Sequence, residues 1–255
     1  MEVQYPDGTI ERKQLPASWE EMNRVQLLQW SRISLQKMEV LQAKISFVKR
    51  ASRFSKATQR HLRKTQLVAI AHQLKFLNTS PIMSRWVVPS FRHFFRRYYG
   101  PGDALSYMTI GEFRITELCF QQYLKTGKKQ FLVALAAAMY RPKNRQDLAL
   151  DIRRPLGKCS TEKREKRFKY LSPMMLQAIL LNYEGCRAFI QRKYAPAFKQ
   201  TKVGKEQPVQ DLQELIETMA GEKLGPIHQV EQTNIHRFFR HLVGIIQEAK
   251  EVQKQ

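Results

Sequence analysis

The residues best suited to bind a ligand form a run of arginine and aromatic side chains between positions 85 and 99. Arginine neutralises phosphates, and aromatic rings stack on unpaired nucleic-acid bases. The run therefore predicts a surface for nucleic acid or another acidic partner. The same rings could instead anchor a long connector in the core, because buried aromatic residues are the general rule. The predicted binding residues are Arg53, Arg60, Arg63, Lys64, Arg85, Trp86, Arg92, Arg96, Arg97 and Tyr98.

The charge of the chain supports an acidic partner. There are 44 Lys and Arg against 22 Asp and Glu, which gives a formal net charge of +22. No acidic residue lies between Glu39 and Asp103, an interval that holds 13 Lys and Arg. A surface this one-sided repels itself, which disfavours the compact state unless an acidic partner or counterions screen it. Hydrophobic residues make up 43% of the chain, which excludes a disordered basic tail.

Motifs for catalysis or for cofactor binding are not found in the sequence. The six histidines are scattered and no cysteine lies at ligand spacing from one of them. The chain has no P-loop, no dinucleotide fingerprint and no Gly-x-Ser-x-Gly elbow. The carboxylate pairs Asp147/Asp151 and Glu214/Glu217 are expected to form ordinary ion pairs, and Cys119 and Cys186 are expected to be core thiols. We therefore expect a protein that is not an enzyme, with no cofactor and no metal.

The elements that must position the basic residues are predicted to be mainly α-helical, as a multi-helix bundle with a short N-terminal β-hairpin. Pro-Asp-Gly at 6–8 supplies the turn of that hairpin. Capping boxes at Ser18–Glu21 and Thr109–Glu112 predict two helix starts. Further helices are expected over about 59–76, from Thr109 to Gly127, over 131–140, from Pro173, and over about 209–221 and 230–252. The Lys158–Lys169 segment is expected to be an exposed, charged helix.

Changes in composition divide the chain into five predicted segments. Proline and glycine interrupt residues 78–108, and residues 197–208 have the composition of a linker. The segments are 1–77, a hairpin with basic helices; 78–108, a Pro/Gly and aromatic-basic connector; 109–196, a central helical core; 197–208, a linker; and 209–255, a C-terminal helical pair.

The expected compartment follows from the cysteines and from the first residues. Three cysteines without close pairing favour a reducing compartment. The first residues lack the basic and apolar regions of a secretory signal. The apolar stretch at 131–139 is far shorter than the roughly 20 residues of a bilayer span. We expect a protein of the cytoplasm or of a virion, not secreted and without membrane contact, and the oligomeric state is left open.

Several short motifs together resemble a known group of proteins. They are Tyr-Pro-Asp-Gly-Thr at 5–9, Leu-Pro-Ala-Ser-Trp-Glu-Glu at 15–21, Gly-Pro-Gly-Asp-Ala-Leu at 100–105, Met-Thr-Ile-Gly-Glu-Phe at 108–113, Ala-Ala-Ala-Met-Tyr-Arg-Pro at 136–142 and Leu-Asn-Tyr-Glu-Gly-Cys-Arg at 181–187. The pattern resembles poorly characterised proteins from the tail-assembly region of bacteriophages and prophages. The motif at 15–21 is similar to the opening of tail assembly chaperone-like proteins. The strongly basic middle of the chain departs from that pattern.

The resemblance implies a non-enzymatic assembly or virion structural component. Its partners would be other phage or assembly proteins in a host cell or virion, and the basic surface would meet an acidic partner. The alternative, from the residues themselves, is a nucleic-acid-binding protein that contacts phosphates of DNA or RNA through the basic 44–97 segment. The sequence leaves this choice open.

Overall fold

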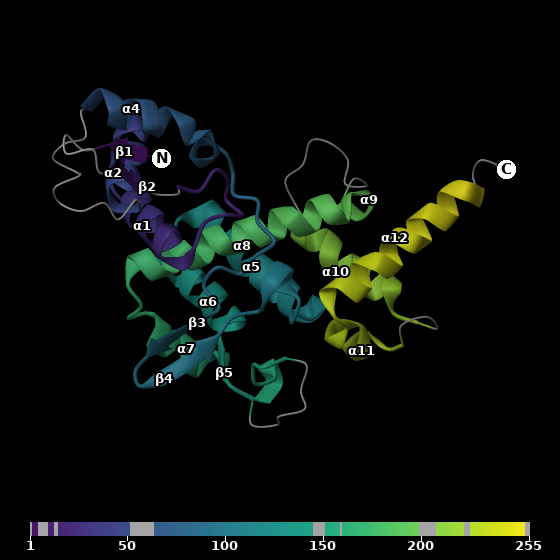
Figure 1. Ribbon diagram of the computed structural model, residues 1–255. Helices are drawn as coiled ribbons and strands as arrows, with labels where there is room; N and C mark the ends of the chain where they lie inside the picture. Colours follow the sequence, from purple (N-terminus) through teal and green to yellow (C-terminus); the bar gives the residue numbers. More distant parts are fainter. Residues whose placement is uncertain are drawn as a thin grey trace. The chain divides into compact units, whose positions relative to one another are not determined.

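The computed structural model of the protein is mainly helical, as predicted (Figure 1). It describes residues 2–4, 10–12, 15–51, 64–144, 151–158, 160–198, 208–221 and 225–252. The chain divides into two compact units: Met1–Val88 with Ser172–Gly185, and Pro89–Leu171 with Cys186–Gln255. The five predicted segments stay a prediction. Among the described residues, no helix is both long enough and apolar enough to cross a membrane.

The first unit joins a small hairpin to a set of helices. Strands β1 (Glu2–Gln4) and β2 (Ile10–Arg12) pair antiparallel, which confirms the N-terminal hairpin, while its predicted turn lies outside the described residues. The helices are α1 (Arg24–Ser34), α2 (Val40–Ala51), α4 (Lys64–Gln73), the 3-10 helix η1 (Lys75–Asn78) and the first part of α8 (Pro173–Lys193). Apolar side chains form its core: the Trp30 ring meets Phe47 edge-on at 5.7 Å, and Trp19 meets Phe76 at 5.5 Å.

The predicted helix start at Ser18 is wrong, because α1 begins six residues later. Asn23 is its N-cap: the Gln26 backbone N–H donates to Asn23 Oδ1 at 3.0 Å, and the Asn23 N–H donates to Gln26 Oε1 at 2.9 Å. The glutamate of the predicted box, Glu21, accepts from the Ala17 N–H at 2.8 Å. Its neighbour Glu20 accepts from both the N–H and the hydroxyl of Ser84 at 2.6 Å. These contacts hold the segment that precedes the cap at Asn23.

The second unit combines a three-stranded sheet with helices. Strands β3 (Ser90–His93), β4 (Arg96–Tyr99) and β5 (Arg141–Pro142) pair antiparallel in the order β3-β4-β5. The helices are η2 (Asp103–Leu105), α5 (Ile110–Thr126), α6 (Lys129–Met139), η3 (Leu156–Lys158), α7 (Thr161–Phe168), the end of α8, α9 (Ala195–Phe198), α10 (Pro208–Met219), α11 (Ile227–Gln232) and α12 (Ile235–Val252). As predicted, α5 ends at Gly127, which has a φ of 64°, and α6 is largely buried.

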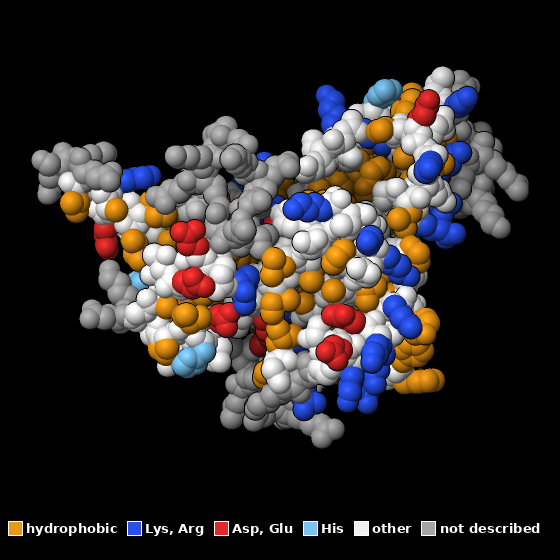
Figure 2. All heavy atoms as spheres, turned by 180° about the vertical axis from the view of Figure 1, so that it is seen from behind, with side chains coloured by type: hydrophobic (Ala, Val, Ile, Leu, Met, Phe, Trp, Pro, Cys, Tyr) orange, Lys and Arg blue, Asp and Glu red, His pale blue; other side chains and the backbone are white. Residues whose placement is uncertain are grey.

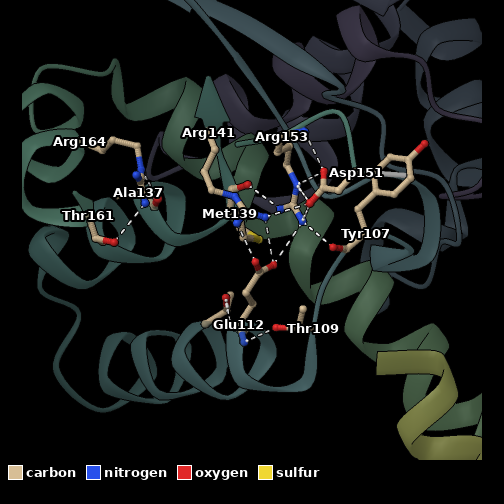
Figure 3. Close-up of polar contacts among 11 residues, drawn as sticks. Tyr107, Thr109, Glu112, Ala137, Met139, Arg141, Asp151, Arg153, Thr161 and Arg164 are labelled. Atoms are coloured by element: carbon tan, nitrogen blue, oxygen red, sulfur yellow. Dashed lines mark hydrogen bonds and ion pairs between the residues drawn. The ribbon is translucent and has the colours of Figure 1, made fainter. Parts of the chain in front are cut away.

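Two helix predictions for this unit need correction, and the segment 78–108, expected to be a connector, contains the β3–β4 hairpin. The helix expected over about 230–252 is two helices, because the backbone between them pairs with the start of α5: the Ile110 N–H donates to Thr233 O at 2.9 Å and the Ile235 N–H to Met108 O at 3.0 Å. Helix α7 is not fully exposed, because Arg164 is buried and donates from Nε to Ala137 O at 2.8 Å (Figure 3).

A buried ion-pair cluster ties α5 to the segments around β5 (Figure 3). The Arg141 and Arg153 side chains are fully buried, and Glu112 accepts from them at 2.7 and 3.2 Å. Asp151 accepts from the same two arginines at 3.1 and 2.9 Å, as expected for an ion pair, while Asp147 lies outside the described residues. Burial and the neighbouring Arg153 lower the pKa of Arg141, whereas the two carboxylates raise it.

This cluster also corrects the second predicted capping box. Thr109 caps α5, since its hydroxyl accepts from the Glu112 N–H at 3.2 Å. The Glu112 carboxylate, however, binds the buried arginines instead of the cap backbone. Arg153 in addition donates to Met139 O at 2.9 Å and to Tyr107 O at 2.8 Å. The cluster thereby satisfies backbone carbonyls at the end of α6 and before α5.

His236 is half-buried, and both of its ring nitrogens have hydrogen-bond partners. Its Nε2 lies 2.8 Å from Ala104 O, which can only accept, so Nε2 carries the proton and Nδ1 accepts from the Tyr194 hydroxyl at 2.9 Å. Burial, with further contributions from Lys193 and Arg240, lowers the pKa of His236 although the bond to Ala104 raises it. The unfolded chain therefore binds a proton more readily than the folded one.

We expect the free energy of unfolding to fall as the pH is lowered through the unfolded-state pKa of histidine, about 6.5. Urea unfolding followed by circular dichroism between pH 7.5 and 5 measures it. The variant His236→Gln keeps a donor for Ala104 and an acceptor for Tyr194 without a titrating group, so its stability should depend less on pH. An equal pH dependence in both proteins would contradict the assignment.

Candidate nucleic-acid interface

The β3–β4 hairpin has one buried face and one exposed face. Phe91 is paired with Tyr98, and Arg92 with Arg97. Because side chains alternate along a strand, the two rings share the face toward the core and the two arginines share the other. The Phe91 ring lies 4.7 Å from Tyr140, and the Tyr98 ring lies 4.8 Å from Phe168. The buried rings therefore hold the hairpin rigidly in the second unit.

The exposed face places arginine opposite arginine. Like charges directly opposite each other destabilise an antiparallel pair of strands. Arg92, Arg96 and Arg97 are exposed, and none of them forms an ion pair or a side-chain hydrogen bond with any described residue. An anion held between Arg92 and Arg97 would remove this repulsion, so the face suits a phosphate or a carboxylate.

The turn of the hairpin consists of two phenylalanines in an unfavourable conformation. Phe94 and Phe95 connect the strands with φ angles of 44° and 61°. A two-residue turn with both φ angles positive normally contains Asn-Gly, because a side chain with a Cβ is strained there. The two rings are also exposed, at 54% for Phe94 and 107% for Phe95. Strain of this kind persists where function needs it, so the turn is a candidate binding element.

The end of α7 lies beside the turn of the hairpin. The exposed Tyr170 ring meets Phe94 edge-on at 5.9 Å, and Lys169 Nζ lies 4.9 Å above the Tyr170 ring. His93 fixes the hairpin here, since its Nε2 lies 3.0 Å from Arg167 O. Figure 2 shows hydrophobic side chains beside Lys and Arg side chains at its lower right, over this end of the unit. We call the hairpin-tip surface the set Arg92, Phe94, Phe95, Arg96, Arg97, Lys169 and Tyr170.

The predicted site residues are only partly brought together. Arg92, Arg96 and Arg97 share the hairpin-tip surface, whereas Lys64, Arg85 and Trp86 belong to the first unit. Arg53, Arg60 and Arg63 lie outside the described residues.

Two of the predicted residues have buried rings. Trp86 is 3% exposed and Tyr98 is 1% exposed. Asn182 holds the chain beside Trp86 by accepting from the Val88 N–H at 3.1 Å and donating to Arg85 O at 2.9 Å. Trp86 is a core anchor, as the alternative interpretation had it, and the ring of Tyr98 is buried as well, so neither ring offers a face for stacking.

Sequence reasoning missed four members of the hairpin-tip surface. Phe94 and Phe95 lie within the run from 85 to 99, but the core alternative assigned both of them, with Trp86 and Phe91, to the core. No sequence signal marked these two positions as a tight turn, because such turns are normally recognised by Asn-Gly. Lys169 and Tyr170 had no signal either, because only the packing of α7 brings them to the turn.

Metal binding and thiol chemistry have no support in the parts of the chain that the structure describes. No group of three or more His, Cys, Asp or Glu side chains there could hold a metal ion. Burial, followed by the charge of Glu165, raises the pKa of Cys119 to about 11, so this thiol is a poor nucleophile. Cys186 is fully buried. Comparisons with protein-family models, with curated proteins and with solved structures find no match to the chain.

Proposed function

We propose that the protein is a non-enzymatic binding protein that holds single-stranded DNA or RNA on the hairpin-tip surface. The observation that carries the proposal is the pair of exposed rings, Phe94 and Phe95, held in a strained turn beside arginines that have no ion-pair partner among the described residues. Stacking of a base on an aromatic ring contributes about 1–3 kcal/mol and tolerates any sequence. Arg92 and Arg97 would neutralise the phosphates on either side of the stacked bases.

The exposed rings favour single strands over duplexes. Bases within a duplex are already stacked on each other, so Phe94, Phe95 and Tyr170 could reach them only after the helix opens. In a single strand the same ring faces are free. The arginines alone would bind both forms through their phosphates, so the rings supply the preference.

The proposal is tested by fluorescence anisotropy with the full-length protein. The probes are a labelled 12-nucleotide DNA strand, the matching RNA strand and the DNA duplex, each titrated at several salt concentrations. We expect the single strands to bind at least about tenfold more tightly than the duplex, because two stacked bases are worth several kcal/mol. Binding that is absent, or tighter for the duplex, would contradict the proposal.

Reversing the charge of the cross-strand pair should weaken this binding. In Arg92→Glu/Arg97→Glu, like charges still face each other, so the hairpin keeps its balance of repulsion. We expect single-strand affinity to fall by at least about tenfold, and the slope of log K against log salt to decrease in size by about 1.4, which corresponds to two lost phosphate contacts. The matched control is Arg192→Glu/Lys250→Glu, two exposed residues away from the surface with the same total charge change. Equal losses in both variants would show non-specific attraction only.

An assembly role, as the resemblance to phage tail-region proteins implies, is a second proposal. It is supported by an apolar groove with a basic rim in the first unit, lined by residues of α1, α2 and α8. Such a groove suits a protein partner better than a nucleic acid. A stoichiometric complex with another phage or assembly protein in the host cytoplasm or the virion, resistant to nuclease, would support this role. A protein recovered only with nucleic acid would count against it.

A further inference from the structure

The groove of the first unit is built from three helices. Helix α1 contributes Val25, Leu28 and Arg32, α2 contributes Lys49 and Arg50, and the first turn of α8 contributes Met174. The groove that they line is open to solvent and has a volume of about 610 Å³. We call this the α1–α2 groove. All of these residues belong to one compact unit, so the groove is a feature of a single body.

The groove face of α1 is not the face that packs the core. Leu27, Trp30 and Ile33 are buried on one side of the helix. Val25, Leu28 and Arg32 recur at helical spacing on the other side, where polar residues are normal. Val25 is nevertheless 38% exposed and Leu28 half-buried. The helix thus has a second apolar stripe that no described element covers completely.

The rim of the groove is uniformly basic. Arg32, Lys49 and Arg50 are exposed, and no acidic residue lines the groove. Each lies in the last turn of its helix, where a cation interacts favourably with the helix dipole. That local effect explains each charge separately, but not why two helix ends converge on an apolar groove. Arg32 and Arg50 have no ion-pair partner within the described part of the chain.

We propose that the α1–α2 groove docks an acidic amphipathic helix of a partner protein. Its aliphatic side chains would lie on Val25, Leu28 and the adaptable Met174, with its carboxylates placed at Arg32 and Arg50. The apolar part of the lining is aliphatic, and no aromatic ring lines the groove. The groove therefore offers no ring for a base to stack on. Gln29 adds an acceptor, because its Oε1 makes no hydrogen bond among the described residues. The inference rests on the second proposed function, the assembly role, and defines the chemistry of its partner. It does not depend on nucleic-acid binding.

The test uses the full-length protein and a labelled synthetic peptide. The probe is a helical 15-residue peptide with leucine at positions i, i+3, i+4 and i+7 and glutamate on both flanks of that stripe. Its control replaces every glutamate with glutamine. We expect the acidic peptide to bind at least about fivefold more tightly than its control at physiological salt, as expected for steered charge pairs at a rim. Equal or absent binding of the two peptides overturns the inference.

Variants locate the peptide on the protein. Arg32→Glu/Arg50→Glu should weaken peptide binding by at least about tenfold, since two attractive pairs become repulsive. Arg92→Glu/Arg97→Glu changes the charge equally on another surface and should leave peptide binding unchanged. Val25→Asp, at an exposed position, should also weaken binding without unfolding the protein. Equal losses in the two double variants overturn the inference.

Two further outcomes separate this inference from the proposed functions. If unlabelled single-stranded DNA displaces the peptide, and Arg32→Glu/Arg50→Glu weakens DNA binding as much as peptide binding, the groove is a nucleic-acid site and the inference fails. If a stoichiometric protein complex forms and survives Arg32→Glu/Arg50→Glu, the partner uses another surface. The assembly role then stands while the inference fails.

Discussion

Replacing Glu112 with glutamine is expected to lower the free energy of unfolding by about 3–5 kcal/mol, the usual cost of breaking a buried ion pair from one side. Glutamine has almost the same shape, so the loss reports the charge and not a cavity. The Arg141 and Arg153 side chains are 0% exposed, and Asp151, with 27% of its side chain exposed, would be left as their only carboxylate within the described structure (Figure 3). One carboxylate would then neutralise the charge of only one of the two buried guanidinium groups.

The same substitution at a partly exposed ion pair is the control. Arg114 and Glu231 lie 2.9 Å apart, and their side chains are 27% and 34% exposed. Glu231→Gln should cost less than about 1 kcal/mol, because water screens this pair. Urea unfolding monitored by circular dichroism compares the two variants with the parent protein. Similar losses in both would show that the buried cluster does not stabilise the second unit more than a surface pair does.

Local chemistry explains which parts of the fold could be predicted. Gly127 ends α5 and Pro173 opens α8 as expected, because a left-handed C-cap and a proline in the first turn act within a few residues. Ser18 is not the cap because Asn23 and Gln26 form a complete capping box five residues later, and Glu20 in the predicted segment binds Ser84, far away in sequence. Non-local contacts of this kind leave no local pattern.

The buried cluster and the hairpin escaped prediction for different reasons. Glu112 and Arg153 are 41 residues apart, so their pairing depends on the packing of α5 against β5. The β3–β4 hairpin lacks the Asn-Gly signal of a tight turn, since Phe94 and Phe95 occupy it. The arginines of the site could be predicted from composition alone. The exposed rings could not be predicted, because tight turns are recognised by Asn-Gly and this turn has phenylalanine at both positions.

Replacing the turn with its preferred residues, Phe94→Asn/Phe95→Gly, should make the protein more stable and a weaker binder. Removing the strain of the left-handed backbone conformation stabilises the protein by about 1–2 kcal/mol for each phenylalanine replaced. Losing the Phe94–Tyr170 ring contact destabilises it by about 0.5–1.5 kcal/mol. The melting temperature should therefore rise by a few degrees. Single-strand affinity should fall by about 5- to 150-fold for each base that no longer stacks. Thermal unfolding and anisotropy on the same preparations measure both.

The variant Phe94→Ala/Phe95→Ala separates the rings from the strain. Alanine has a Cβ, so it removes the rings but keeps the left-handed conformation unfavourable. Affinity should fall as far as in the Asn-Gly variant, while the gain in stability should be absent. If the Phe94→Asn/Phe95→Gly variant binds single strands as tightly as the parent protein, the rings do not contact the ligand. If both double variants lose single-strand affinity as expected, the rings themselves bind the ligand. The strain at the turn is then the energetic cost of exposing two rings beside Arg92 and Arg97, where a single strand can reach them.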